Sequence, residues 1–107
     1  MLVPSVDAAT VPSDSLILDV RDDDEWAAGR IEGAMHIPIY EIIQRIDEIP
    51  TDRDIVCVCR VGNRSGQVTQ FLHEQGYSIR NLDGGMMAWA RTGRPMTASS
   101  GAVPTVL

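Results

Sequence analysis

The chain has 107 residues, a net charge of −6 at pH 7, two cysteines and no lysine. This length predicts one domain with a single core, and the acidic balance argues against binding to nucleic-acid backbones. Two cysteines only two positions apart make no disulfide framework, and no apolar run approaches membrane-spanning length. We therefore expect a cytoplasmic protein with neither a nucleic-acid nor a membrane partner.

Short apolar runs alternate along the chain with apolar residues at helical spacing. In chain order the sequence predicts a marginal strand at Leu2-Val3, strands at 16–20, 35–37, 55–58 and 78–82, and helices at 23–28, 39–49, 65–76 and 84–91. This alternation is typical of an α/β fold with an open, mainly parallel sheet and helices on both faces. Residues 96–107 lack periodicity, so we expect a flexible C-terminal tail after a domain at 1–95.

The seven residues from Cys59 to Ser65 join the predicted strand 55–58 to the helix that follows. Such a turn curls backbone N–H groups around its first position, and the helix N-terminus adds partial positive charge there. A cysteine at that position is favoured as the thiolate, which is the reactive form. Gly62 supplies the backbone freedom for the turn, and Ser65 is a candidate N-cap. The pattern predicts Cys59 as a nucleophile and Cys57, inside the strand, as a core residue.

Charged residues accompany this loop. Arg60 and Arg64 add two permanent cations that favour an anionic ligand. Asp19 and Arg21 lie at the end of a neighbouring predicted strand. We expect them to form a buried pair, or a hydrogen bond to the loop, and so to support its shape.

Three blocks of sequence occur in an order and at distances typical of a known family. They are Leu18–Arg21 with Glu25-Trp26 and Gly29–Ala34, then Cys59–Ser65, then Asn81–Gly85 with Trp89. In these blocks, which span roughly residues 5 to 95, the chain resembles the single-domain rhodaneses, a family of persulfide-forming sulfurtransferases. The family usually has His where this chain has Arg30.

The resemblance implies about five parallel strands ringed by helices, with Cys59 as the nucleophile that carries the sulfur. Its thiolate would attack the outer sulfur of thiosulfate or a similar donor, and cyanide or a thiol would discharge the resulting persulfide. No cofactor is needed for this chemistry. The residues expected to bind the substrate are Arg60, Val61, Gly62, Asn63, Arg64 and Ser65.

Two alternatives remain beside this expectation. A persulfide relay or binding module that serves a protein sulfur acceptor differs only in its partner. Cysteine phosphatases also place Cys and Arg around an anion loop, but four residues separate Cys59 from Arg64 where those enzymes have five, and the shorter loop favours sulfur. A metal site is not expected, because Cys57, Cys59, His36 and His73 lack the spacing of metal ligands.

Overall fold

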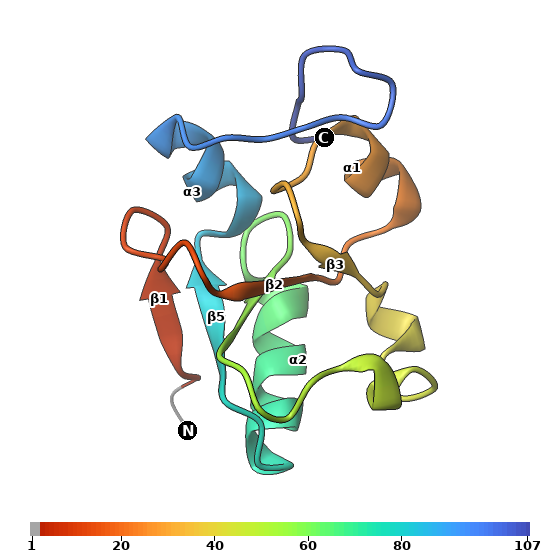
Figure 1. Ribbon diagram of the computed structural model, residues 1–107, viewed down its shortest axis with the longest axis vertical. Helices are drawn as coiled ribbons and strands as arrows, with labels where there is room; N and C mark the ends of the chain where they lie inside the picture. The colour runs from red at the N-terminus through yellow and green to blue at the C-terminus, as the bar shows by residue number, and fades with distance from the viewer. Residues whose placement is uncertain (1–2) are drawn as a thin grey trace.

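A five-stranded sheet forms the centre of the protein, in a computed structural model that describes residues 3–107 (Figure 1). The strands are β1 (Ser5–Asp7), β2 (Leu16–Asp19), β3 (Met35–His36), β4 (Ile55–Val58) and β5 (Ile79–Asp83). They lie in the order β1-β5-β4-β2-β3, and every neighbouring pair is parallel. The predicted α/β class and parallel sheet are confirmed, with β4 in the central position.

Helices cover both faces of the sheet, as expected. The helix α2 (Asn63–Glu74) and the 3-10 helices η1 (Ile39–Glu41) and η2 (Ile46–Glu48) pack with one core cluster, and α3 (Gly85–Thr92) packs with the other. All of β4 is buried, and its alternating side chains send Cys57 to the α2 face and Val56 and Val58 to the α3 face. A membrane-spanning helix is absent from residues 3–107, since even α2 has only 12 residues.

The segment 39–49 is not the single helix that its isoleucines predict. It forms η1 and η2, each three residues long, separated by a turn. Ile42 and Ile49 are buried, whereas Ile43 is 74% exposed, so these side chains do not share one helical face. β-Branched residues gain little from a regular helix, and two short turns suffice to bring Ile42 and Ile49 into the core.

The start of α2 also differs from the prediction. The helix begins at Asn63, two residues early, so Ser65 is not its N-cap. That position belongs to Gly62, whose φ of +109° suits glycine and strains other residues. The expected freedom of Gly62 is therefore used, and Ser65 is left inside the first turn with its hydroxyl available for other contacts.

The two ends of the domain are only partly as expected. The marginal strand at Leu2-Val3 involves Leu2, which lies outside the described residues, and Val3 is in no strand. The first described strand is β1, which pairs with β5. The remaining helix, α1 (Asp23–Ala28), has its predicted bounds.

Residues 96–107 fold back across α1 (Figure 1). Thr97 pairs with Arg30 in an antiparallel bridge, and the N–H groups of Ser99 and Thr105 donate to carbonyls of α1 at 3.0 and 2.9 Å. The Arg30 side chain donates to the Ser99 hydroxyl at 2.6 Å. The segment thus has a defined path over α1, and its flexibility stays a prediction.

Candidate functional site

The candidate nucleophile lies at the junction of β4 and α2. Cys59 follows the last residue of β4, and residues 60–62 make the turn into α2. In a parallel sheet the carboxyl ends of the strands share one edge, which is where such folds bind their ligands. Because β4 is the central strand, the loop stands at the middle of that edge, between the ends of β2 and β5.

The sulfur of Cys59 is surrounded by hydrogen-bond donors. The Gly62 N–H donates to Sγ at 3.1 Å, and the Ser65 Oγ lies 3.2 Å from it. Burial opposes ionisation, but hydrogen bonds from the Ser65 hydroxyl and from the backbone N–H groups of Ser65, Gly62 and Val61 outweigh it. Together they lower the pKa of Cys59 from its ordinary value. The arrangement favours a thiolate, as the loop pattern predicts.

Access to this sulfur is narrow. Cys59 is only 1% exposed. Val61, at 45% exposure, is the apolar residue of the loop that faces solvent.

Cys57 has a different environment two residues earlier on the same strand face. It is fully buried in the core cluster that includes Leu18 and Leu72. Burial raises the pKa of its thiol far above the ordinary value. The thiol therefore stays protonated, which agrees with the core role expected for Cys57.

The amino end of α3 supports the loop from the far side. The N–H groups of Met86 and Met87 donate to the carbonyls of Cys59 and Arg60 at 2.8 and 3.1 Å. Gly85 makes this approach possible: a Cβ there would lie 2.5 Å from each of these carbonyl oxygens. The glycine at position 85 therefore allows the backbone of the loop to approach the start of α3 closely.

Asn81 on β5 is a functional candidate that the motif analysis did not single out. Its amide Nδ2 donates to the Gly62 carbonyl at 3.1 Å, and its Oδ1 accepts from the Ser65 hydroxyl at 2.6 Å. Asn81 belongs to the third sequence block of the family resemblance. The signal in the sequence was a polar amide in the middle of a strand, followed directly by Leu82-Asp83-Gly84-Gly85.

The two loop arginines are both engaged within the protein. Arg64 forms a bidentate ion pair with Glu25 of α1, with distances of 2.7 and 2.9 Å. Arg60 donates from Nε to the backbone oxygen of Leu107, the last residue of the sequence, at 2.7 Å. The structure therefore brings Arg64 to the loop with its charge already balanced. Substrate binding by either arginine stays a prediction.

Asp19 and Arg21 form the buried pair that was one of the two expectations for them. Both side chains are fully buried, and Arg21 holds the carboxylate through Nε and Nη2 at 2.9 and 2.7 Å. Nη2 also donates to the Gly29 carbonyl at 2.7 Å, at the end of α1. The pair thus connects the end of β2 to α1, and any support it gives the loop is indirect.

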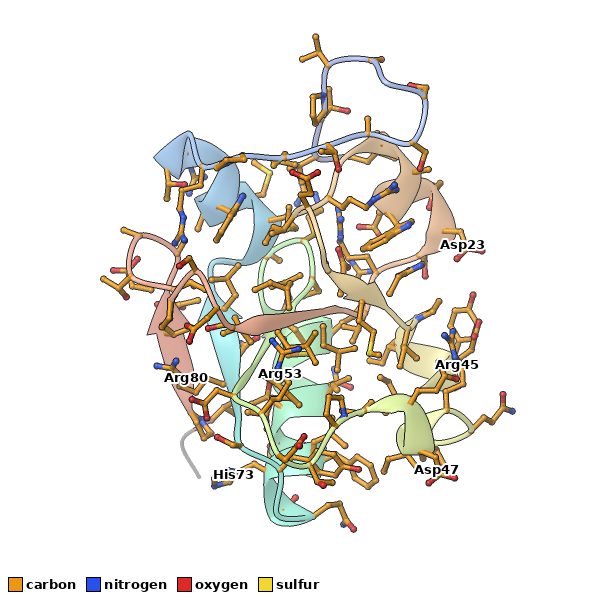
Figure 2. The ribbon with its side chains drawn as sticks, viewed as in Figure 1. Asp23, Arg45, Asp47, Arg53, His73 and Arg80 are labelled. Atoms are coloured by element: carbon orange, nitrogen blue, oxygen red, sulfur yellow. The ribbon has the colours of Figure 1, made fainter. Side chains whose placement is uncertain are left out.

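The two histidines lie in different places. His73 stands at the lower end of α2 in Figure 2, whereas the loop is at the upper end of the same helix. His36 stacks on Trp26 with ring centroids 4.6 Å apart and contacts the Arg21 carbonyl through Nε2 at 2.8 Å. His73 is therefore not a partner of the loop cysteine, and Trp26, within α1, is a packing residue.

Known proteins share both this sequence and this fold. A family model described as Rhodanese-like domain matches residues 6–92. A sulfurtransferase of Allochromatium vinosum is 46% identical over 89 residues, which cover 82% of this chain and 83% of that protein. The thiosulfate sulfurtransferase GlpE of Pseudomonas fluorescens is 36% identical over 88 residues, covering 81% and 80%.

A solved structure agrees with these matches. The crystal structure of a rhodanese-related protein from Thermoplasma volcanium superposes with a TM-score of 0.84 at 30% identity, covering 88% of this chain and 97% of that one. The family match spans the sheet from within β1 to β5, together with α2 and α3, the helices on either side of the Cys59 loop. The chain belongs to the rhodanese-like domain family.

Proposed function

We propose that the protein is a sulfurtransferase that moves a sulfane sulfur from thiosulfate or a similar donor to cyanide or a thiol through a persulfide on Cys59. The transferase class is supported by the family and by relatives named sulfurtransferases. The single observation that carries the finer proposal is the group of N–H and O–H donors directed at the Cys59 sulfur. These donors stabilise negative charge without having to reorganise during the reaction.

The first step is attack of the Cys59 thiolate on the outer sulfur of thiosulfate. A sulfur–sulfur bond forms to Sγ, and the bond between the outer sulfur and the sulfonate breaks. Sulfite leaves with the bonding pair, and one negative charge remains on the terminal sulfur of the persulfide. No oxidant is consumed, because the sulfane sulfur carries its oxidation state with it.

The second step returns the enzyme to its starting form. Cyanide or a thiolate attacks the terminal sulfur and removes it, and the bonding pair returns to Sγ of Cys59 as the thiolate. Two successive substrates thus meet one nucleophile, so we expect ping-pong kinetics. The loop N–H groups suit both anionic forms, the thiolate and the persulfide, since they point to the same small region.

Intact-mass spectrometry tests this proposal. After incubation with thiosulfate and removal of excess donor, the protein should gain the mass of one sulfur atom and lose it again on addition of cyanide. Cys59→Ala should abolish the gain, and Cys57→Ala, the matched control, should retain it. If the mass gain persists in Cys59→Ala and disappears in Cys57→Ala, the nucleophile is Cys57 and the proposed assignment to Cys59 is wrong. Efficient hydrolysis of an aryl phosphate by the unmodified protein would favour the phosphatase alternative.

A further inference from the structure

The Ser65 hydroxyl has two acceptors within reach and only one proton. Its Oγ lies 2.6 Å from Oδ1 of Asn81 and 3.2 Å from Sγ of Cys59. A hydroxyl donates one hydrogen bond at a time. Ser65 is fully buried, so these two side chains compete for its proton away from bulk water. Whichever acceptor receives the hydrogen bond, the other loses it.

The orientation of the Asn81 amide is fixed by its second contact. Nδ2 donates to the Gly62 carbonyl at 3.1 Å. A flipped amide would place two acceptors against each other at Gly62 and would direct its N–H group toward Ser65. Oδ1 is therefore held as an acceptor for the Ser65 hydroxyl, at the shorter of the two distances.

We propose that Asn81 is a positioning residue that controls the ionisation of Cys59. Its Oδ1 competes with Sγ of Cys59 for the hydrogen bond that the Ser65 hydroxyl donates. The proposal rests on the proposed function only in taking Cys59 as the nucleophile. While the thiol is neutral, Ser65 donates to Asn81. When the thiolate forms, the hydroxyl rotates to donate to Sγ, and its hydrogen bond to Oδ1 of Asn81 breaks. In the persulfide the charge moves to the outer sulfur, and the hydroxyl returns to Asn81.

The other charged and titratable groups around the loop do not duplicate this control. The charge of Arg64 is balanced by Glu25 of α1, and the Arg60 side chain donates to the backbone oxygen of Leu107. On the sheet side, Asp19 and Arg21 neutralise each other, and Cys57 stays protonated. Ser65 is thus the one side-chain donor to Sγ among the described residues 3–107, and Asn81 is its competitor.

Two substitutions at one position separate competition from loop support. Asn81→Ala and Asn81→Asp both lose the Nδ2 donor to Gly62, but only Asn81→Ala also loses the acceptor. The readout is the pH profile of Cys59 alkylation by iodoacetamide, followed by peptide mass mapping. Asn81→Ala should lower the apparent pKa of Cys59, raising the alkylation rate below that pKa about threefold to tenfold. Asn81→Asp should raise it. A loosened loop would instead raise the pKa in both variants, and that result would overturn the proposal.

The Ser65→Ala background supplies the second test. Ser65→Ala alone should raise the pKa of Cys59. Adding Asn81→Ala to it should shift that pKa no further, because the hydroxyl for which Asn81 and Cys59 compete has already been removed. A full Asn81→Ala shift in this background would overturn the proposal. If Asn81→Ala fails to fold, Asn81→Asp serves, since its pKa rise must shrink in the Ser65→Ala background. Alkylation needs no sulfur donor, so failure of sulfur transfer and failure of this proposal are distinguishable.

Discussion

At the scale of single residues, burial and hydrogen bonding shift the pKa values of the two cysteines in opposite directions. Cys57 and Cys59 face the same side of the sheet, and both have little contact with solvent. Cys57 lies within β4, where the strand's N–H groups are used by neighbouring strands. Cys59 lies one residue beyond the strand, where the turn directs free N–H groups toward its sulfur. A shift of two positions therefore separates a thiol of raised pKa from a thiol of lowered pKa.

This contrast predicts the selectivity of alkylation. Iodoacetamide at neutral pH should label Cys59 faster than Cys57 by on the order of a hundredfold or more, since only thiolates react. The Cys59 rate should rise with pH and level off below the pKa of an ordinary thiol, because its own pKa is lowered. Labelling of Cys57 should begin only when the protein unfolds. Equal labelling of both cysteines in the folded protein would contradict the pKa directions on which this argument depends.

At the scale of elements, the sequence predicts those helices and strands whose apolar pattern is compatible with only one type of secondary structure. The run 55–58 is buried on both sides, and so its β-branched residues indicate a central parallel strand. The isoleucines of 39–49 fit a helix equally well as a pattern, but two of them reach the core through short turns. That choice depends on the space left between α2 and the sheet, which the local sequence does not contain.

The candidate site divides in the same way. The Cys59 loop is local in sequence, so the curl of its backbone N–H groups around the Cys59 sulfur could be predicted. The contacts that hold it come from distant elements: Asn81 on β5, Gly85 on α3 and Glu25 on α1. Because these residues are far apart in sequence, their contacts could not be predicted from the local pattern. Arg64 is the example: the sequence indicates a free cation, whereas in the structure Arg64 is paired with Glu25.

Gly85 gives a prediction at this scale. Gly85→Ala should disturb the loop, because the new Cβ would lie 2.5 Å from the Cys59 and Arg60 carbonyl oxygens. Gly93→Ala is the matched control: its φ of +73° resembles the +60° of Gly85, but a Cβ there meets nothing within 4 Å. In both variants the free energy of unfolding should fall by about 1–2 kcal/mol, because alanine is strained at a positive φ. In urea unfolding Gly85→Ala should lose more than Gly93→Ala, and it alone should slow Cys59 alkylation. Equal effects would show that steric contact at Gly85 is unimportant.

The Glu25–Arg64 pair links α1 to the start of α2, and its strength should depend on pH. The hydrogen bonds from Arg64 hold the pKa of Glu25 below its usual value of 4.5. A carboxylate with a lowered folded-state pKa stabilises the protein above its unfolded-state pKa, and this contribution disappears as the pH falls through the folded-state value.

Glu25→Gln tests this link, since Gln still suits the acceptor position for the Asp22 N–H at the start of α1. We expect the variant to be less stable by about 1 kcal/mol at pH 7, because the pair is partly exposed on the Arg64 side. The difference in unfolding free energy between the two proteins should diminish below pH 4.5. A difference that stays constant down to pH 3 would mean that Glu25 acts by shape and not by charge.

At the scale of the whole molecule, the charge distribution opposes an anionic substrate. The net charge is −6. Near the loop, Arg64 is neutralised by Glu25, while the exposed Asp22–Asp24 run begins α1 and Asp83 ends β5. Asp23 stands at the outer side of α1 in Figure 2. Arg60, the other cation of the loop, is also engaged, since its Nε donates to the backbone oxygen of Leu107. The local positive field that the sequence predicts from the two arginines is therefore weakened in the structure, because both side chains have partners within the protein.

Salt should therefore help the reaction with a charged donor. Raising NaCl from about 20 to about 200 mM shortens the Debye length from roughly 20 Å to below 10 Å and screens the acidic surface from the approaching dianion. We expect kcat/KM for thiosulfate to rise about twofold or more, and that for a neutral sulfane donor to stay unchanged. In the Asp23→Asn, Asp24→Asn variant the thiosulfate rate at low salt should already be higher, and its gain with salt smaller. If salt instead lowers kcat/KM for thiosulfate alone, then Arg60 and the amino end of α2 attract the donor more strongly than the acidic surface repels it.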